Sequence, residues 1–164
     1  MTAIPPVEKE AVALFADLLG EPGALLPVLH RVQERLGHVP PHYVPLIAHA
    51  LNLSRAEVQG VLSFYHDFRS EPAGRHVLRI CQAEACQAMG AGALSAHAQA
   101  RVGAALHGTS GDRRFTLEPV YCLGNCACSP ALMIDGVLHG RVSAERFDAL
   151  LEALLDAPLE APPG

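Results

Sequence analysis

Five cysteines in two groups constrain this chain more than any other feature of its sequence. Cys81 and Cys86 form a C-x4-C pair. After a gap of 35 residues, Cys122 and Cys126 form a C-x3-C pair, and Cys128 follows two positions later. Two short loops that each supply thiolates can wrap the two sides of a compact cationic core. The pattern therefore predicts a metal or iron-sulfur centre with cysteine ligands.

The spacing of the cysteines favours a [2Fe–2S] cluster. Structural zinc sites and thioredoxin-type redox disulfides prefer C-x2-C pairs, so zinc is the less favoured alternative. Rieske ligation needs histidines beside the cysteines, and none of the nine histidines lies inside either cysteine loop. The expected ligands are Cys81, Cys86, Cys122 and Cys126. The remaining cysteine, Cys128, is expected to be a buried or free thiol.

The composition is that of a globular protein in a reducing compartment. A chain of 164 residues, 50% hydrophobic and 18% charged, can form one or two folded domains. Both halves contribute to the net charge of −5, so the chain does not attract nucleic acids over long range. The sequence lacks a secretory signal and any apolar run near the ~20 residues of a membrane span. We therefore expect a cytoplasmic protein without membrane insertion, whose cysteines are metal ligands or redox groups.

The first 70 residues have the periodicity of a small helical bundle. The expected helices cover residues 7–19, 24–36, 41–51 and a segment that begins after 54. Leu36 is expected on the apolar face of the second helix, and Gly37 is placed to end it. Ser54 and Glu57 form a capping box that opens the fourth helix. We assign residues 1–70 to a helical domain.

The polar segment 69–75 contains proline and glycine and predicts a domain boundary. Beyond it the hydrophobic period changes to that of strands and helices in alternation. The expected elements are a strand at 76–81, a helix at about 88–102, a turn-rich loop at 108–114, a strand at 115–122, a hairpin around 135–136, a helix at 144–155 capped by Ser143, and a frayed tail from 156. The predicted fold class is α+β, with a helical bundle followed by an α/β domain over 71–164.

Each cysteine pair begins where a predicted strand ends. If the two strands are neighbours, their loops leave the sheet at one edge and four sulfurs can converge. Cys86 lies just before the predicted helix, whose N-terminus would favour the thiolate. Gly124 and Asn125 allow a tight backbone with N–H groups turned toward sulfur.

Two other motifs suggest rival functions. Residues 90–95 begin like a dinucleotide fingerprint, but Ser95 replaces the third glycine and the motif lies inside a predicted helix, so close helix packing is preferred. Residues 46–64 have the rhythm of a DNA-binding helix-turn-helix, yet the second helix offers mainly Arg55 and Gln59. An iron-sulfur redox-sensing DNA-binding regulator is the alternative from another class, although we expect no nucleic-acid partner.

Both halves of the chain resemble one family. LLPVLHRVQERLGHVP, VQGVLSFYHDF, the C-x4-C pair and CLGNC together resemble the thioredoxin-like [2Fe–2S] subunit of the NADH dehydrogenase module of respiratory complex I. The resemblance extends from about Leu25 to Leu155. The short chain and the segment CACSPALMIDG look most like the gamma subunit of soluble, molybdenum-containing NAD-dependent formate dehydrogenases. The complex I subunit and the diaphorase subunit of NAD-reducing hydrogenases are close alternatives.

The resemblance implies a thioredoxin-like domain with one [2Fe–2S] cluster bound by the four cysteines that match the family pattern, Cys81, Cys86, Cys122 and Cys126. It also implies docking beside a flavin- and NAD-binding subunit and single-electron exchange with its FMN. A further molybdenum-containing or other substrate-oxidising subunit would complete the complex, so the chain is an accessory subunit and not catalytic alone. Phe64, Tyr65 and Phe68 are a candidate for part of the docking surface, or else they fill the core of the bundle.

Overall fold

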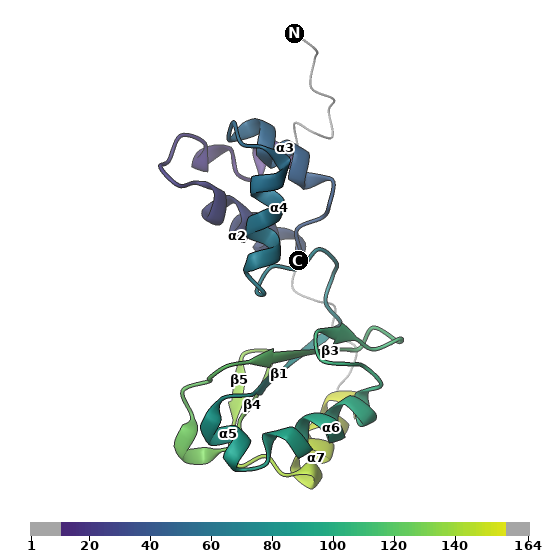
Figure 1. The fold of residues 1–164 in the computed structure, drawn as a ribbon. Coiled ribbons are helices and arrows are strands. Elements are labelled where there is room, and N and C mark those ends of the chain that lie inside the picture. The colour runs from purple at the N-terminus through teal and green to yellow at the C-terminus, as the bar shows by residue number, and fades with distance from the viewer. Residues whose placement is uncertain (1–10, 157–164) are drawn as a thin grey trace. The chain divides into compact units, whose positions relative to one another are not determined.

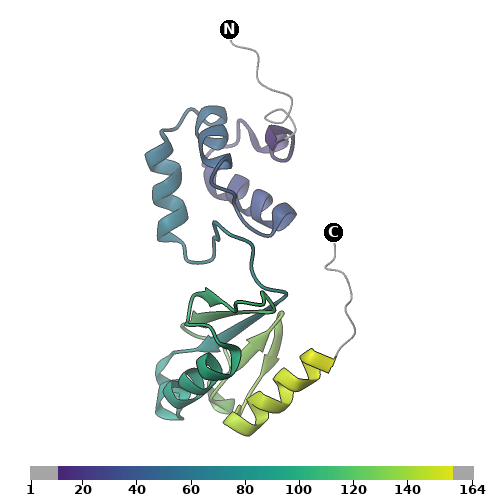
Figure 2. The same cartoon turned by 90° about the vertical axis from the view of Figure 1, so that its right-hand side faces the viewer.

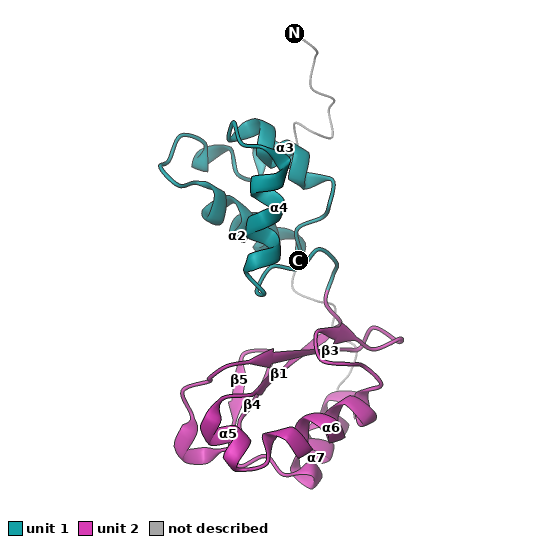
Figure 3. Cartoon of the chain, in the orientation of Figure 1, with its two compact units in different colours: residues 1–72, 164 teal, residues 73–163 magenta. Residues whose placement is uncertain are grey.

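The computed structural model describes residues 11–156, which form two compact units (Figures 1 and 3). Unit 1 ends at Pro72 and unit 2 begins at Ala73. Each unit has its own hydrophobic core. The α+β fold class is confirmed, because helices alone build the first unit and a sheet with helices builds the second.

Unit 1 is a bundle of short helices. Its elements are the 3-10 helix η1 (Ala16–Leu18) and the helices α2 (Leu25–Leu36), α3 (Tyr43–Ala50) and α4 (Arg55–Phe64). Gly37 ends α2 in the left-handed conformation, as expected. The capping box at α4 is also present, since Ser54 Oγ accepts from the Glu57 amide and the Glu57 carboxylate accepts from the Ser54 amide. The largest fully buried core side chains are Phe15, Val28, Leu29, Val32, Val39, Ile47 and Val58.

Two sequence predictions for unit 1 are wrong. The helix expected over 7–19 does not continue, because residues 11–13 are helical but the chain then turns before η1; residues 7–10 lie outside the described part. The turn accompanies complete burial of Phe15, and this packing outweighs helix propensity. Leu36 is 37% exposed, because it lies in the last turn of α2 rather than over the core.

Unit 2 is a five-stranded sheet in the order β2-β3-β1-β4-β5. The strands are β1 (His76–Cys81), β2 (Gly108–Thr109), β3 (Phe115–Val120), β4 (Leu132–Ile134) and β5 (Val137–His139). β1 and β3 are parallel, and the other pairs are antiparallel. The helices α5 (Glu84–Ala88), α6 (Ala91–Val102) and α7 (Ala144–Asp156) lie on one side of the sheet (Figures 1 and 2). Strand residues such as Ile80 and Leu117 pack there against Leu94 and Phe147 of the helices.

Three details of unit 2 differ from the sequence prediction. The loop expected at 108–114 contains the short strand β2, which pairs with β3. The helix expected at 88–102 is two helices, because Gly90 takes a left-handed φ of 93° between α5 and α6. The second strand ends at Val120, two residues before Cys122. The order is therefore β-α-α-β-β-β-β-α instead of β-α-β-β-β-α.

The hairpin and the last helix are as predicted. Asp135 and Gly136 both have positive φ, 48° and 86°, which is the signature of a type I′ turn between β4 and β5. The Asp135 carboxylate accepts from the Val77 amide at 2.8 Å and lies 2.6 Å from Nδ1 of His76, which ties the turn to the start of β1. Ser143 Oγ accepts from the Arg146 amide at the start of α7. Apart from Asp156, the predicted tail lies outside the described residues.

The other motifs of the sequence have structural roles in the described residues. Ala91 and Ala98 of α6 are fully buried, and Ser95 accepts a hydrogen bond from Gln82, so the glycine-rich stretch serves helix packing. Phe68 is buried in the core of unit 1, whereas Phe64 is 75% exposed. No helix within residues 11–156 is long and apolar enough to cross a lipid bilayer.

Candidate iron-sulfur site

Both cysteine loops leave the sheet at the same edge. β1 and β3 are adjacent and parallel, and Cys81 at the end of β1 lies opposite Val120 at the end of β3. The carboxyl ends of parallel strands meet at one edge, so the loops that follow them are neighbours. The two strands are therefore neighbours, as the predicted convergence of the four sulfurs requires.

Cys81 and Cys86 form the buried half of the site. Each is 2% exposed, and both pack with Ala91 and Ala131 in a small apolar cluster. Burial raises the pKa of the Cys81 thiol, and the neighbouring Cys86 adds to that rise. Burial alone would raise the pKa of Cys86 too, but hydrogen bonds from other groups together outweigh it and hold that pKa below its usual value. Cys86 is therefore the thiol of this pair that ionises more readily.

Cys122 and Cys126 form the exposed half of the site. Their sulfur atoms lie 3.9 Å apart, and both residues are exposed. The Gly124 amide donates to Cys122 Sγ at 3.3 Å, as the sequence predicted for this loop. Gly124 has a φ of 72°, which explains why glycine is needed to turn the amide inward. The hydrogen bond with Cys122 and its charge raise the pKa of Cys126, and the charge of Cys86 adds to this.

Contacts across the two loops join the pairs into one site. Leu123, from the second loop, packs against the buried pair, and its backbone partly offsets the rise in the pKa of Cys81. The Cys81 amide donates to the Ala131 carbonyl at 3.1 Å, and the backbone at Ala131 acts to lower the pKa of Cys86. Among residues 11–156, no three His, Cys, Asp or Glu side chains gather as they would around one metal ion. The sulfurs stand instead as two pairs.

The predicted position of Cys86, just before the long helix, is wrong, because Cys86 lies instead in the first turn of a short helix. Cys86 is the third residue of the five-residue helix α5, and α6 begins only at Ala91. Its sulfur instead donates to Ser129 Oγ at 3.4 Å. The break at Gly90 separates the cysteine from the long helix, so the dipole of α6 does not act on it in the way that the sequence suggested.

Sequence reasoning missed the residues that position the second loop. The segment that follows β5 holds this loop, since the Arg141 amide donates to the Cys128 carbonyl at 2.6 Å and the Val142 amide to the Pro130 carbonyl at 3.0 Å. Gly140 lies so close that an added Cβ would stand 2.7 Å from Cys128 Cβ. A glycine at position 140 was the available signal in the sequence, but a glycine alone does not reveal such a close approach. Cys128 itself is half-buried against Gly140.

Comparison with known proteins decides what this site belongs to. The family model for the thioredoxin-like [2Fe-2S] ferredoxin matches residues 11–155. The chain belongs to the thioredoxin-like [2Fe–2S] ferredoxin family. Membership confirms the family resemblance drawn from the sequence, and the protein therefore carries a [2Fe–2S] cluster. The family match does not support the narrower resemblance to the gamma subunit of formate dehydrogenases.

The relatives of this ferredoxin-family chain are subunits of NAD-linked oxidoreductases. It is 40% identical over 130 residues to the E subunit of the NADH-quinone oxidoreductase of Pseudomonas aeruginosa, covering 79% of this chain and 78% of the relative. It is 34% identical over 146 residues to the Escherichia coli K12 protein of the same name, covering 88% of each chain. The crystal structure of an air-oxidized NAD+-reducing [NiFe]-hydrogenase matches with a TM-score of 0.67 and 26% identity, over 85% of this chain. This chain spans only 24% of that hydrogenase chain.

The residues at the sheet edge fit such a cluster. A [2Fe–2S] cluster with thiolate ligands needs four cysteine sulfurs, and hydrogen bonds to those sulfurs help to set its reduction potential. The site offers two sulfur pairs. The Gly124 amide donates to Cys122 Sγ, and the backbone at Ala83, Leu123 and Ala131 acts to lower the pKa of the buried thiols. One pair is shielded from water and the other faces it.

Proposed function

We propose that this chain is the electron-transfer subunit of an NAD-linked oxidoreductase complex and that Cys81, Cys86, Cys122 and Cys126 bind its cluster. The observation that carries the proposal is the pairing of the sulfurs at one sheet edge. A sulfur pair 3.9 Å apart on the second loop lies at the same sheet edge as a buried cysteine pair on the first. The [2Fe–2S] cluster supplies reversible one-electron chemistry when it is bound.

The polypeptide gives this site two unlike sides. Cys81 and Cys86 are covered by protein, which excludes water from that side. Cys122 and Cys126 are exposed, so electrons reach and leave the site through the second loop. A flavin- and NAD-binding subunit that docks there would take part in single-electron exchange through its FMN. Hydride chemistry belongs to that partner, so the chain is an accessory subunit and is not catalytic alone.

We infer that the parent complex is a soluble, cytoplasmic, molybdenum-containing NAD-dependent formate dehydrogenase. The short chain and the segment around Cys126 support this choice by resemblance to its gamma subunit. Complex I is the second candidate, favoured by the NADH-quinone oxidoreductase relatives. An NAD-reducing hydrogenase is the third, favoured by the structural match. Purification of the chain from its host with its natural partners tests this choice, because a molybdenum subunit, a membrane arm or a hydrogenase each identifies one complex.

The cluster assignment has a direct chemical test. The chain purified anaerobically is expected to contain about two irons and two acid-labile sulfides per molecule. Stoichiometric zinc without sulfide would contradict the assignment and favour a structural zinc site.

The ligand set is tested by a matched pair of cysteine variants. Cys126→Ser is expected to destroy or strongly perturb the cluster, because it removes one of the exposed sulfur pair. Cys128→Ser, two residues away, is expected to leave the EPR signal of the reduced protein largely intact. Equal damage from both substitutions would show that the ligand set is wrong.

The redox-sensing regulator has less support. α3 and α4 form a helix pair, but the relatives described above are oxidoreductase subunits. Sequence-specific DNA binding that persists at high salt and changes with cluster redox state would favour the regulator instead.

A further inference from the structure

Ser129 is a buried residue of the second cysteine loop, and its hydroxyl contacts the first loop. Its side chain is close to both loops, with Oγ 3.4 Å from Cys86 Sγ and 2.8 Å from the Cys126 carbonyl oxygen. The residue is 7% exposed, so water does not compete strongly for the hydroxyl. Ser129 therefore touches one proposed ligand from each sulfur pair.

The backbone holds Ser129 in this position. The residues on either side of it, Cys128 and Pro130, both accept hydrogen bonds on their carbonyls from Arg141 and Val142. Gly140 packs against Cys128 with no room for a side chain. The hydroxyl is consequently preorganised, because the chain that carries it is fixed from both sides.

Iron binding would remove the thiol proton from the hydrogen bond between Cys86 Sγ and Ser129 Oγ. With a free thiol, Cys86 can donate to Ser129 Oγ while Ser129 donates to the Cys126 carbonyl. A cysteine that ligates iron has no proton, so the serine proton is the only one left between the sulfur and the carbonyl. Hydrogen bonds to an anionic acceptor are stronger than those to a neutral one, which favours the sulfur.

We propose that the Ser129 hydroxyl donates to Cys86 Sγ in the cluster-loaded protein and raises the reduction potential of the cluster. Addition of one electron adds one negative charge, part of which falls on the ligand sulfurs. A donor aimed at one of those sulfurs stabilises the reduced form more than the oxidised form. Ser129 is thus a positioning residue that acts through Cys86, and this role rests on the ligand set proposed above.

The experiment compares midpoint potentials of the full-length, cluster-loaded chain by EPR-monitored redox titration. Ser129→Ala and Ser129→Val are expected to lower the equilibrium constant for reduction about tenfold, a shift of about 59 mV for a one-electron couple. Ser129→Thr keeps the hydroxyl in a shape that closely matches Val, and it is expected to remain near the wild-type potential.

Ser110→Ala provides a matched control. Ser110 is 5% exposed, and its Oγ hydrogen-bonds Asp112 and the Phe115 amide at the opposite end of β3 from the cysteines. Its loss is expected to lower thermal stability without moving the potential. A change in potential that merely follows stability would therefore appear in Ser110→Ala as well, and would overturn the proposal.

The outcomes separate this proposal from the ligand assignment. Equal potentials in the wild type, Ser129→Ala and Ser129→Val would overturn the tuning role. If the Ala and Val variants both lose the cluster while Ser129→Thr retains it, the hydroxyl is needed for cluster assembly. That result would also overturn the proposed tuning of the potential. The proposed ligand set is tested separately by Cys86→Ser, because an unchanged cluster in that variant would contradict the ligand set whatever the potential of the Ser129 variants.

Discussion

At the scale of single residues, glycine sets how closely the chain can approach itself around the cysteines. Gly124 turns an amide toward Cys122, and Gly140 lets the segment after β5 pack on Cys128. An added Cβ at Gly140 would also lie 2.9 Å from the Cys128 carbonyl oxygen, which is backbone and cannot rotate away. The second loop is therefore held by contacts far from it in sequence.

Gly140→Ala is expected to destabilise unit 2 by about 1–3 kcal/mol, because the methyl group overpacks a fixed backbone. Thermal unfolding measures this when it is followed by the visible absorbance of the cluster for unit 2 and by far-UV circular dichroism for the helices of unit 1. Gly60→Ala is the matched control, since Gly60 lies inside α4 with no atom within 4 Å of an added Cβ. That change is expected to stabilise α4 by about 0.5–1 kcal/mol. Equal effects of the two substitutions would show that the close contact at Gly140 is unimportant.

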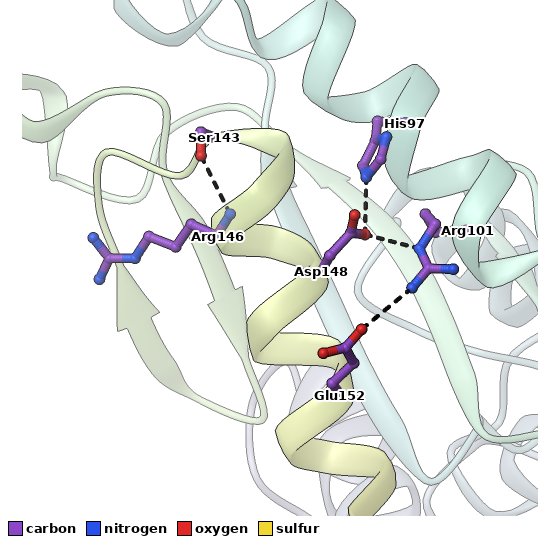
Figure 4. A network of polar contacts seen from close by, with 6 residues as sticks. All are labelled: His97, Arg101, Ser143, Arg146, Asp148 and Glu152. Carbon is purple, nitrogen blue, oxygen red and sulfur yellow. Dashed lines mark hydrogen bonds and ion pairs between the residues drawn. The ribbon is translucent and has the colours of Figure 1, made fainter.

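At the scale of elements, a polar network fastens α6 to α7 (Figure 4). His97 Nε2 lies 2.9 Å from Asp148 Oδ1, and Arg101 Nε donates to the same oxygen at 2.8 Å. Arg101 also lies 4.0 Å from Glu152. Hydrogen bonds from His97 and then Arg101 lower the pKa of Asp148. The network joins two of the three helices that lie on one side of the sheet.

The lowered pKa makes the contribution of Asp148 dependent on pH. The stabilisation is fully present above the unfolded-state value of about 3.9 and is lost as the pH falls through the lower folded-state pKa. Asp148→Asn is therefore expected to reduce stability near neutral pH and to flatten the loss of stability on acidification. Urea unfolding at several pH values between neutral and acidic checks this.

Glu152→Gln serves as the control for this network. The Glu152 side chain is 68% exposed, and its carboxylate lies 4.0 Å from Arg101. The substitution is therefore expected to change stability only slightly. A pH profile of Asp148→Asn that runs parallel to that of the wild type would contradict the linkage to Asp148.

At the scale of the whole molecule, we propose that the two units are separate domains, with a boundary near residue 72. Gln33 of α2 anchors the end of unit 1, because its side chain donates to the Asp67 carbonyl at 2.7 Å and accepts from the Arg69 amide at 2.8 Å. Gly74 anchors the start of unit 2 by donating to Thr116 Oγ1. Each end of the connection is thus tied to its own unit.

Gln33→Ala tests whether the units unfold separately. Loss of both hydrogen bonds is expected to destabilise unit 1 by about 1–3 kcal/mol and to leave the cluster in unit 2 unaffected. Far-UV circular dichroism then shows an earlier helical transition, while cluster bleaching occurs at the wild-type temperature. Gln59→Ala, at an exposed position of α4, is expected to change stability by less than about 0.5 kcal/mol. Bleaching that moves together with the helical transition would mean that the units unfold as one.

Several helix ends and turns, and the type of cluster, were predictable from the sequence. The capping box at Ser54, the stop at Gly37 and the turn at Asp135 were predictable because each depends on residues within a few positions of one another. Cysteine spacing indicated a [2Fe–2S] centre because the number of cysteines and the lengths of their loops can be read directly from the sequence. These features are local, so no knowledge of distant neighbours was needed.

The contacts that hold the two cysteine loops in place could not be predicted from the sequence. The contacts of Ser129 with Cys86, of Arg141 with Cys128 and of Leu123 with Cys81 join loops that are separated along the chain. Likewise, the burial of Phe15 overrode a helical pattern, and the break at Gly90 moved Cys86 away from the start of α6. Such contacts depend on which segments the sheet and cores bring together, and a one-dimensional pattern does not carry that information.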